Sequence, residues 1–280
     1  MKMGGFEVDL VSDGTFWLDG GAMFGVVPRV FWEKLSPPDQ KNRIKLALNC
    51  LLVRGNGKTV LIDTGCGFKY SHRELQIYGI QHECTVLDDL DRLGVAPSDI
   101  DLVINTHLHF DHCGGNTMHK DEGLAASFPN ATYVVQRQEF EDATHPSERT
   151  QASYFEENWK PLLDRGQVDL LDGQHTVCEG IECLPTPGHT LGHQSVKIQS
   201  DGDTLFFLGD LCPTSAHVPL PWIMSYDLYP AVTLDTRKEV YRQAIREGWT
   251  LFFEHDPETL VGRLTEKDGK YRAEPIPWGS

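Results

Sequence analysis

Short apolar segments recur along the chain, separated by turns rich in Gly, Asp and Asn. Runs of Val, Ile, Leu and Phe between such turns are typical of buried β-strands. Two pairs of these runs are joined by short turns, Arg54-Gly-Asn-Gly-Lys58 and Ser200-Asp-Gly-Asp203, which predict β-hairpins. The predicted strands are Leu48–Val53, Val60–Ile62, Leu102–Ile104, Tyr133–Val135, Val196–Ile198, Leu205–Leu208 and Leu251–Phe253.

Amphipathic helices are predicted between these strands. Residues 86–93 place Val and Leu on one face, and Gly94 can end that helix. Thr236 and Glu239 have the spacing of a capping box and predict the start of a second helix, which Gly248 would end. Strands and helices are interleaved in both halves, and no low-complexity linker divides residues 1–280. We therefore expect one α+β domain with two mixed β-sheets packed face to face and helices outside.

The charge of the chain limits its partners. The net charge is −16 over 280 residues, and no Lys/Arg-rich run is present. Nucleic acid and anionic membranes are therefore not expected as partners, and a neutral small molecule fits better. No apolar stretch approaches the roughly 20 residues that span a bilayer, and residues 1–10 do not read as a signal peptide. Seven cysteines without a CxxC pair indicate reduced thiols in a cytoplasmic protein.

The segment that follows the strand Leu102–Ile104 carries four residues able to bind a metal ion: His107, His109, Asp111 and His112. In an extended strand end, alternate side chains project to the same side, so His107 and His109 can approach one ion together. After a turn, Asp111 and His112 can approach from another direction. Imidazole and carboxylate suit a divalent ion such as zinc. The alternative is a polar loop whose histidines only form hydrogen bonds.

Three further positions place a potential ligand at a strand end or in a glycine-rich turn. His189 lies in Pro-Thr-Pro-Gly-His, Asp210 follows Leu-Phe-Phe-Leu-Gly, and His255 follows Leu-Phe-Phe-Glu. Each residue taken singly would more often be structural. Together with the first four residues they complete two coordination shells, so we predict a site for two neighbouring divalent cations.

These motifs, in this order, resemble the metallo-β-lactamase superfamily of hydrolases from about residue 45 to 256. The resemblance implies a four-layer αββα sandwich and two metal ions, with zinc expected and iron, manganese or cobalt as alternatives. An aspartate stands at the bridging position, where zinc β-lactamases have a cysteine, which places the chain with the lactonase-like, glyoxalase II-like and RNase Z-like members. It implies that His107, His109 and His189 hold one metal, that Asp111, His112 and His255 hold the other, and that Asp210 bridges both.

The expected chemistry is hydrolysis by a hydroxide between two cations, with Asp111 placed to orient it and carry its proton. Within residues 16–45, a glycine-hinged loop with Met23, Phe24 and Trp32 could form a lid over an apolar substrate. A satellite core or a homodimer contact would fit this composition equally well. A second apolar loop, residues 219–226 with Trp222 and Tyr226, is expected at the same cleft.

Both apolar loops are similar to those of YtnP-type quorum-quenching lactonases, and the similarity runs over nearly the whole chain. It implies that the chain opens the lactone ring of N-acyl-homoserine lactones. In better-studied homoserine lactonases a tyrosine follows the bridging aspartate by three residues, whereas Pro213 stands here. Tyr226 or His217 could contact the substrate in its place. The alternatives are another carboxylester or thioester hydrolase, a phosphotriesterase, or a metal-binding protein without catalysis.

Overall fold

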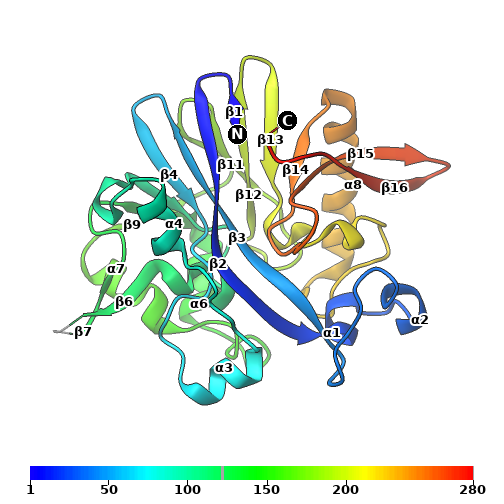
Figure 1. The fold of residues 1–280 in the computed structure, drawn as a ribbon, viewed down its shortest axis with the longest axis horizontal. Helices are drawn as coiled ribbons and strands as arrows, with labels where there is room; N and C mark the ends of the chain where they lie inside the picture. The colour runs from blue at the N-terminus through cyan, green and yellow to red at the C-terminus, as the bar shows by residue number, and fades with distance from the viewer. Residues whose placement is uncertain (121–122, 280) are drawn as a thin grey trace.

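The computed structural model describes residues 1–120 and 123–279 and has two seven-stranded β-sheets (Figure 1). The sheets face each other, and helices cover their outer sides, as the sequence predicted for an α+β fold with four layers. The first sheet has the order β1-β2-β3-β4-β5-β8-β9, and a separate ribbon pairs β6 with β7. These strands are β1 (Lys2–Met3), β2 (Phe6–Asp19), β3 (Arg43–Gly55), β4 (Lys58–Ile62), β5 (Leu102–Ile104), β6 (Thr117–Lys120), β7 (Gly123–Ala126), β8 (Thr132–Gln136) and β9 (Val168–Leu171).

The second sheet runs in sequence order, with parallel pairing between β13 and β14. Its strands are β10 (His175–Cys178), β11 (Ile181–Pro185), β12 (Gln194–Ser200), β13 (Asp203–Phe207), β14 (Thr250–Phe252), β15 (Val261–Lys267) and β16 (Lys270–Pro275). The helices are α1 (Gly20–Phe24), α2 (Arg29–Trp32), α3 (His72–Tyr78), α4 (Val86–Arg92), α5 (Phe110–Cys113), α6 (Arg137–Thr144), α7 (Lys160–Asp164) and α8 (Pro230–Glu247).

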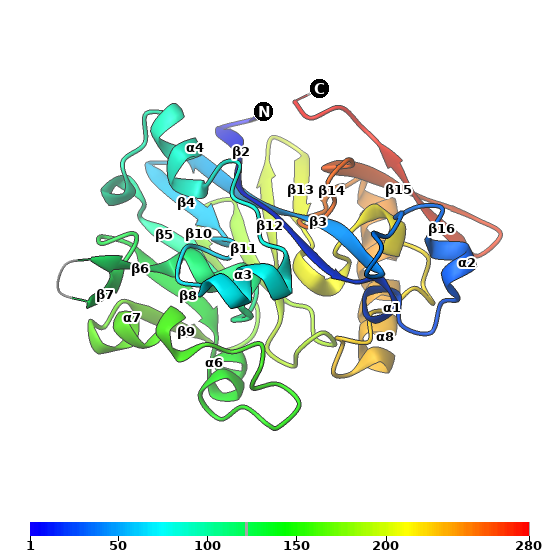
Figure 2. The same ribbon diagram turned by 60° about the horizontal axis from the view of Figure 1, so that its bottom comes forward.

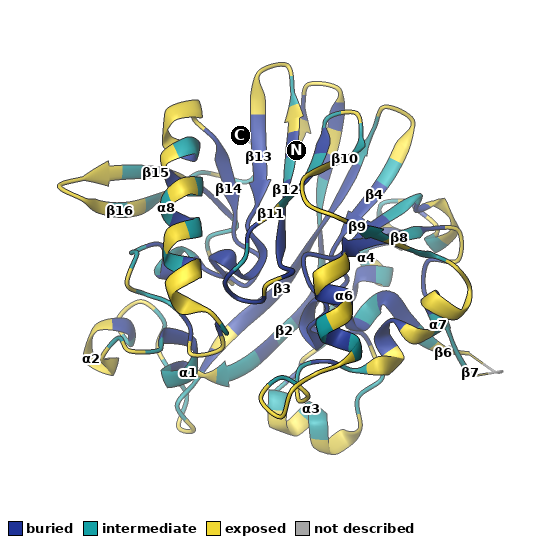
Figure 3. Cartoon of the chain, turned by 180° about the vertical axis from the view of Figure 1, so that it is seen from behind, coloured by how far each residue is buried: buried dark blue, intermediate teal, exposed yellow. Residues whose placement is uncertain are grey.

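The main hydrophobic core lies between the two sheets. Apolar side chains of β3, β4 and β5 pack there against those of β12, β13 and β14, including Val53, Ile62, Ile198 and Phe207, all fully buried. Two outer cores lie under the helices, one beneath α4 and the other beneath α8. In Figure 3, α8 is exposed on its outer side and buried toward the second sheet. Burial on both faces explains why the central strands read as continuous apolar runs.

The predicted strands and hairpins are confirmed. Each of the seven apolar runs falls within an observed strand or ends within one residue of it. The turn between β3 and β4 is formed by Asn56 and Gly57, with φ of 50° and 71°, and Gly55 pairs with Lys58. Positive φ at both positions is the geometry that makes Asn-Gly favourable in tight hairpins. The second hairpin pairs Ser200 with Asp203 between β12 and β13.

The predicted helix ends at Gly94 and Gly248 are confirmed, whereas the predicted start of the second helix is wrong. Helix α4 begins after Thr85, which caps it, and ends just before Gly94. The capping box predicted at Thr236 is not a helix start, because α8 begins at Pro230 and runs through it to Glu247. The Thr236 hydroxyl instead donates a hydrogen bond to the carbonyl oxygen of Pro187. Proline at the first helical position has a preset φ and lacks only an N–H that would be unpaired there.

The apolar segment 16–45 is not a free loop. It contains the end of β2, the short helices α1 and α2, and the start of β3. Figure 1 shows β2 and β3 running diagonally to α1, and Figure 2 shows α1 and α2 beside α8, away from α3. Within residues 1–120 and 123–279, no helix is both long and apolar enough to cross a membrane.

Candidate metal centre

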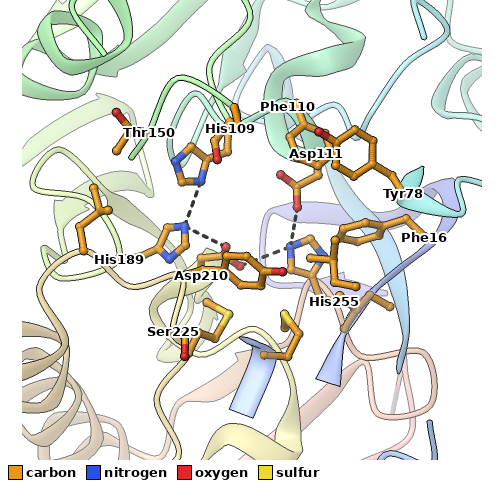
Figure 4. Close-up of a pocket in the computed structure, with 18 of the residues that line it drawn as sticks. Phe16, Tyr78, His109, Phe110, Asp111, Thr150, His189, Asp210, Ser225 and His255 are labelled. Atoms are coloured by element: carbon orange, nitrogen blue, oxygen red, sulfur yellow. Dashed lines mark hydrogen bonds and ion pairs between the residues drawn. The ribbon is translucent and has the colours of Figure 1, made fainter. Parts of the chain in front are cut away.

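The seven predicted ligand residues meet at one place between the two sheets. From the first sheet come the loop after β5, with His107 and His109, and helix α5, with Asp111 and His112. From the second sheet come the turns that follow β11, β13 and β14. All seven side chains are buried. Figure 4 shows five of them, His109, Asp111, His189, Asp210 and His255, pointing toward a common centre.

One half of the cluster consists of His107, His109 and His189, whose ring nitrogens lie within 4.8 Å of one another. The Nδ1 of His189 lies 3.0 Å from the carboxylate of Asp227, which accepts a hydrogen bond and therefore fixes the proton on Nδ1. The Nε2 of His189 then carries a lone pair, and it points at Nδ1 of His109 at 3.0 Å. The Nδ1 of His107 lies 3.1 Å from the Thr106 hydroxyl, so its Nε2 also faces the centre as an acceptor.

The other half consists of Asp111, His112 and His255. The Nδ1 of His255 donates to the carbonyl oxygen of Ala47 at 2.8 Å, and the Nδ1 of His112 lies 3.1 Å from Asp63 and 3.2 Å from Glu254. With both protons held on Nδ1, the two Nε2 atoms present lone pairs to each other at 3.1 Å. A carboxylate oxygen of Asp111 lies 3.7 Å from each of these nitrogens.

Asp210 lies between the two halves. Its Oδ2 is 3.2 Å from Nε2 of His189, and its Oδ1 is 3.3 Å from Nε2 of His255. The backbone N–H of Asp210 donates to Nε2 of His193 at 3.1 Å, so His193 orients the aspartate from outside the cluster. One carboxylate oxygen therefore faces each half, which is the arrangement of a bridging ligand.

Burial and the charges of neighbouring side chains together set the pKa values in the cluster. Burial alone would raise the pKa of Asp210, but the facing imidazoles of His189, His112 and His255 lower it well below its ordinary value. Burial depresses the pKa of His107 far below that of a free imidazole, and neighbouring histidines lower it further. Burial would also lower the pKa of His189, but the carboxylates of Asp210 and Asp227 raise it. Burial would also lower the pKa of His112 and His255, but the carboxylates of Glu254 and Asp111 raise the first well above its ordinary value, and Asp210 raises the second to about 9. The cluster thus favours positive charge beside Asp210, which divalent cations would supply.

The geometry fits two divalent cations. Two pairs of ring nitrogens face each other, Nε2 of His112 with Nε2 of His255 and Nε2 of His189 with Nδ1 of His109, and a cation placed at each pair could bind both nitrogens. Ligands at about 2.0–2.1 Å from a tetrahedral zinc ion lie roughly 3.3 Å apart, close to the observed contacts of 3.0, 3.1 and 3.3 Å. Within the described part of the chain, Nε2 of His107 and Oδ1 of Asp210 have no hydrogen-bond partner although they are buried. Both atoms face the proposed ions.

A cavity of about 380 Å³ opens over the cluster, a size typical of small-molecule sites. Asp111 and Asp210 lie at its floor with His109, His189 and His255. One wall is mostly apolar, and the rim is polar. The wall comprises Phe16, Leu18, Met23, Leu46, Tyr78, Phe110, Met224 and Leu228, and the rim includes Arg149, Thr150, Ser153, Ser225 and Tyr226.

Two of the six predicted substrate contacts, Met23 and Tyr226, line this cavity. The prediction for Phe24, Trp32 and His217 is corrected, because these side chains are buried in an aromatic stack behind the wall. The ring of Phe24 lies 5.2 Å from that of Trp32 and 4.4 Å from that of His217.

The sixth predicted contact, Trp222, does not line the cavity either and packs edge-on against Phe24. His217 acts on the wall only indirectly, since its Nε2 donates to the carbonyl oxygen of Met23 at 2.9 Å. Pro213 is also buried, and its carbonyl oxygen accepts the backbone N–H of His255. The apolar character of these residues reflects packing rather than contact with a ligand.

The carboxylates that fix the imidazoles were not predicted from the sequence. Asp63 and Glu254 contact His112, and Asp227 contacts His189. Asp63 ends the apolar run of β4 as Asp210 ends that of β13, and this shared pattern is a signal that could have identified it. Nothing in the sequence singles out Arg149, which donates to the carbonyl oxygen of Ser225 at 2.8 Å across the cavity rim.

Comparisons with known proteins agree with this geometry. The profile of the metallo-β-lactamase superfamily matches residues 44–255. An N-acyl homoserine lactonase from a Bacillus species is 32% identical over 235 residues, covering 78% of this chain and 85% of that protein. A crystal structure of a probable metal-dependent hydrolase from Staphylococcus aureus is 30% identical with a TM-score of 0.90, covering 99% of this chain and all of the other. AidC, a dizinc quorum-quenching lactonase solved with a product, is 22% identical with a TM-score of 0.81, covering 99% and 96%, which establishes similarity of fold.

Proposed function

The chain belongs to the metallo-β-lactamase superfamily of metal-dependent hydrolases, and from that premise we propose that it opens the lactone ring of N-acyl-homoserine lactones. The observation that carries the proposal is the paired cluster, with Asp210 between its two halves, at the floor of a cavity with an apolar wall. An amphiphilic neutral ester matches such a cavity, and the acidic chain offers no basic surface run for a polyanion.

We propose zinc as the metal, because imidazole nitrogens and carboxylate oxygens at these spacings suit it. His107, His109 and His189 would hold one ion, Asp111, His112 and His255 the other, and Asp210 both. When bound, two adjacent dications supply Lewis acidity toward a carbonyl oxygen and a hydroxide nucleophile at neutral pH. Asp63, Glu254 and Asp227 keep the imidazole protons on the outer nitrogens, which leaves the inner nitrogens free to act as ligands.

Asp111 is the residue we propose for proton transfer. It lies at the cavity floor and faces His112 and His255. In lactone hydrolysis a hydroxide adds to the carbonyl carbon, the ring C–O bond breaks, and the alkoxide formed takes up a proton. A carboxylate beside the reacting atoms can accept the proton of the hydroxide and deliver it to that alkoxide. The products are one carboxylate and one alcohol on the same molecule, the N-acyl homoserine.

The cavity walls fit the two ends of such a substrate. Phe16, Leu18 and Met224 offer an apolar surface for an acyl chain. Tyr226 is placed to donate its hydroxyl hydrogen to a substrate oxygen. Burial, with the nearby carboxylate of Asp19, raises the pKa of Tyr226 to about 12, so the hydroxyl stays protonated at neutral pH. We propose that Tyr226 acts in place of a tyrosine at position 213.

The test is acid release on ring opening, measured for a panel of short- and long-chain N-acyl-homoserine lactones together with metal content. A thioester and a phosphotriester serve as comparison substrates, because two-cation sites polarise carbonyl and phosphoryl oxygens alike. We expect two equivalents of metal and a kcat/KM for lactones well above that for either comparison substrate. Two equivalents of metal without turnover of any ester would mean a metal-binding protein, and faster turnover of the thioester or phosphotriester would reassign the substrate.

A further inference from the structure

A buried carboxylate outside the ligand set lies where the loops of two proposed ligands meet. Glu139 is on the first turn of α6 and has no exposed surface. In the described part of the chain it forms no ion pair with Lys or Arg. A buried charge without a cationic partner is costly unless hydrogen bonds compensate it. Three donors provide these bonds.

The three donors come from the two loops that carry His109 and His189. The backbone N–H of Leu108 donates to Oε1 of Glu139 at 3.0 Å, and the Thr190 hydroxyl donates to Oε2 at 2.5 Å. Leu108 directly precedes His109, and Thr190 directly follows His189. One carboxylate thus holds the chain beside each of two imidazoles whose nitrogens face each other at 3.0 Å.

The third donor, Tyr154, also places its aromatic ring beside the imidazole of His109. The hydroxyl of Tyr154 donates to Oε1 of Glu139 at 2.9 Å, and the Tyr154 ring lies 4.9 Å from the ring of His109. Glu139 therefore fixes both the backbone before His109 and a neighbour of its imidazole.

The approach of the second loop to α6 is equally close. A Cβ atom added to Gly192 would lie 2.2 Å from the backbone nitrogen of Glu139, so a larger residue would separate the loop from the helix. This contact does not involve the carboxylate. It independently indicates that the loop after His189 is built to pack on the start of α6.

We propose that Glu139 is a positioning residue that sets the separation of His109 and His189 and so tunes the affinity of the metal ion between them. The inference rests on the proposed ligand assignment. It predicts an effect on one ion of the pair, because the hydrogen bonds of Glu139 reach the His109 and His189 loops. His112 and His255 are instead fixed by Asp63, Glu254 and Ala47.

The experiment compares Glu139→Ala and Glu139→Gln with the wild type by titrating zinc against a competing chelator. Loss of the carboxylate should weaken one of the two zinc ions by about 10–100-fold, the usual effect of losing an outer partner of a ligand. The Gln variant should stay near wild type, since its oxygen can accept from Leu108 and Tyr154 while its amide donates to the Thr190 hydroxyl. Variants His189→Ala and His255→Ala identify which ion is affected, and Glu141→Ala, exposed on the same helix, is the matched control.

Two further variants test the inference even if the Glu139→Ala protein does not fold. Thr190→Val and Tyr154→Phe each remove one hydrogen bond and keep the carboxylate, and each should weaken the same ion by a smaller factor. Wild-type affinity for both ions in Glu139→Ala, or in both milder variants, would overturn the inference, as would a Gln variant as weak as the Ala variant. A wild type that binds two ions but hydrolyses no lactone would contradict the proposed function and not the role of Glu139.

Discussion

Asp210 lies between the two halves of the proposed two-cation site. Asp210→Asn should lower the metal content from two equivalents and reduce kcat/KM by at least about a hundredfold, since even an outer partner is worth about 10–100-fold. The physical reason is that one carboxylate oxygen faces each half, and the amide replaces one of them with a donor. Metal analysis and lactone turnover on the same sample measure both effects.

Asp203→Asn is the matched control for that change, because Asp203 is exposed at the other end of the same strand, β13. It should leave metal content and turnover unchanged. An Asp210→Asn protein that keeps two metal ions and full activity would show that the bridging assignment is wrong.

The hydroxyl of Tyr226 is the proposed substrate contact at the rim of the cavity. If its hydroxyl donates to a substrate oxygen, Tyr226→Phe should lower kcat/KM by roughly 5–30-fold, the factor expected for the loss of about 1–2 kcal/mol from one hydrogen bond. Metal content should be unchanged, since the contacts of Tyr226 are not with the ligand nitrogens. Unchanged turnover would remove Tyr226 from the mechanism.

His217 makes the free energy of unfolding depend on pH in the acidic range. Burial, followed by the charge of Arg237, lowers its pKa to about 3, whereas an unfolded histidine titrates near 6.5. Below about pH 6.5 the His217 imidazole is therefore protonated in the unfolded chain but stays neutral in the folded chain. Stability from the neutral ring is fully present above that pH and is lost as the pH falls toward 3.

Substitution of His217 by Gln should remove this component. The free energy of unfolding of His217→Gln, measured by urea denaturation in the presence of chelator, should fall less steeply than that of the wild type. The expected difference in slope is up to about 1.4 kcal/mol per pH unit between pH 6.5 and 3. Two parallel curves over that range would contradict the prediction.

At the scale of elements, α1 carries two adjacent buried residues, of which only one lines the cavity. Met23 lines the cavity, while Phe24 is stacked between Trp32 and His217. Phe24→Ala should lower the free energy of unfolding by about 3–5 kcal/mol, as expected for a fully buried aromatic ring. It should also raise KM, because the helix that presents Met23 loses its anchor. Chemical denaturation and steady-state kinetics measure the two effects.

Phe31→Ala is the control within the same segment, since Phe31 of α2 is 57% exposed. Its free energy of unfolding should change by no more than about 0.5 kcal/mol, the usual effect of a surface substitution. Equal destabilisation by the two substitutions would show that the aromatic stack does not anchor α1.

At the scale of the whole molecule, the proposed metal ligands come from both sheets. His107, His109, Asp111 and His112 follow β5 of the first sheet. His189, Asp210 and His255 follow β11, β13 and β14 of the second. Ligands that bind only the folded state stabilise it by about 4 kcal/mol at a thousand times their dissociation constant. Chelation should therefore lower the unfolding temperature, and added zinc should restore it. An unfolding temperature that is the same with and without chelator would contradict a metal link between the sheets.

The sequence alone was sufficient for seven strands that include the centre of both sheets, for the two hairpins and for the identity of the seven clustered residues, but strands such as β2, β11 and β15 were not predicted. Buried strands such as β5 and β13 are continuous apolar runs, and a polar residue that follows such a run is conspicuous. Local rules were less reliable at the start of α8, where the pattern at Thr236 also fits the interior of a helix. A capping box is a local pattern, and the packing of the whole helix decides where it begins.

Only the tertiary structure decided which apolar side chains line the cavity and which carboxylates contact the clustered histidines. Met23 and Phe24 are neighbours in the same buried cluster, yet only Met23 also lines the cavity, because a helix turns adjacent residues to different sides. Asp227 contacts His189, and Glu254 contacts His112. Glu139 holds the chain beside His109 and His189. In each case the partner comes from another segment of the chain. The sequence determined which residues can bind metal, since that is a property of the side chain. The fold determined their separation, their tautomers and the shape of the cavity, because these depend on contacts between distant segments.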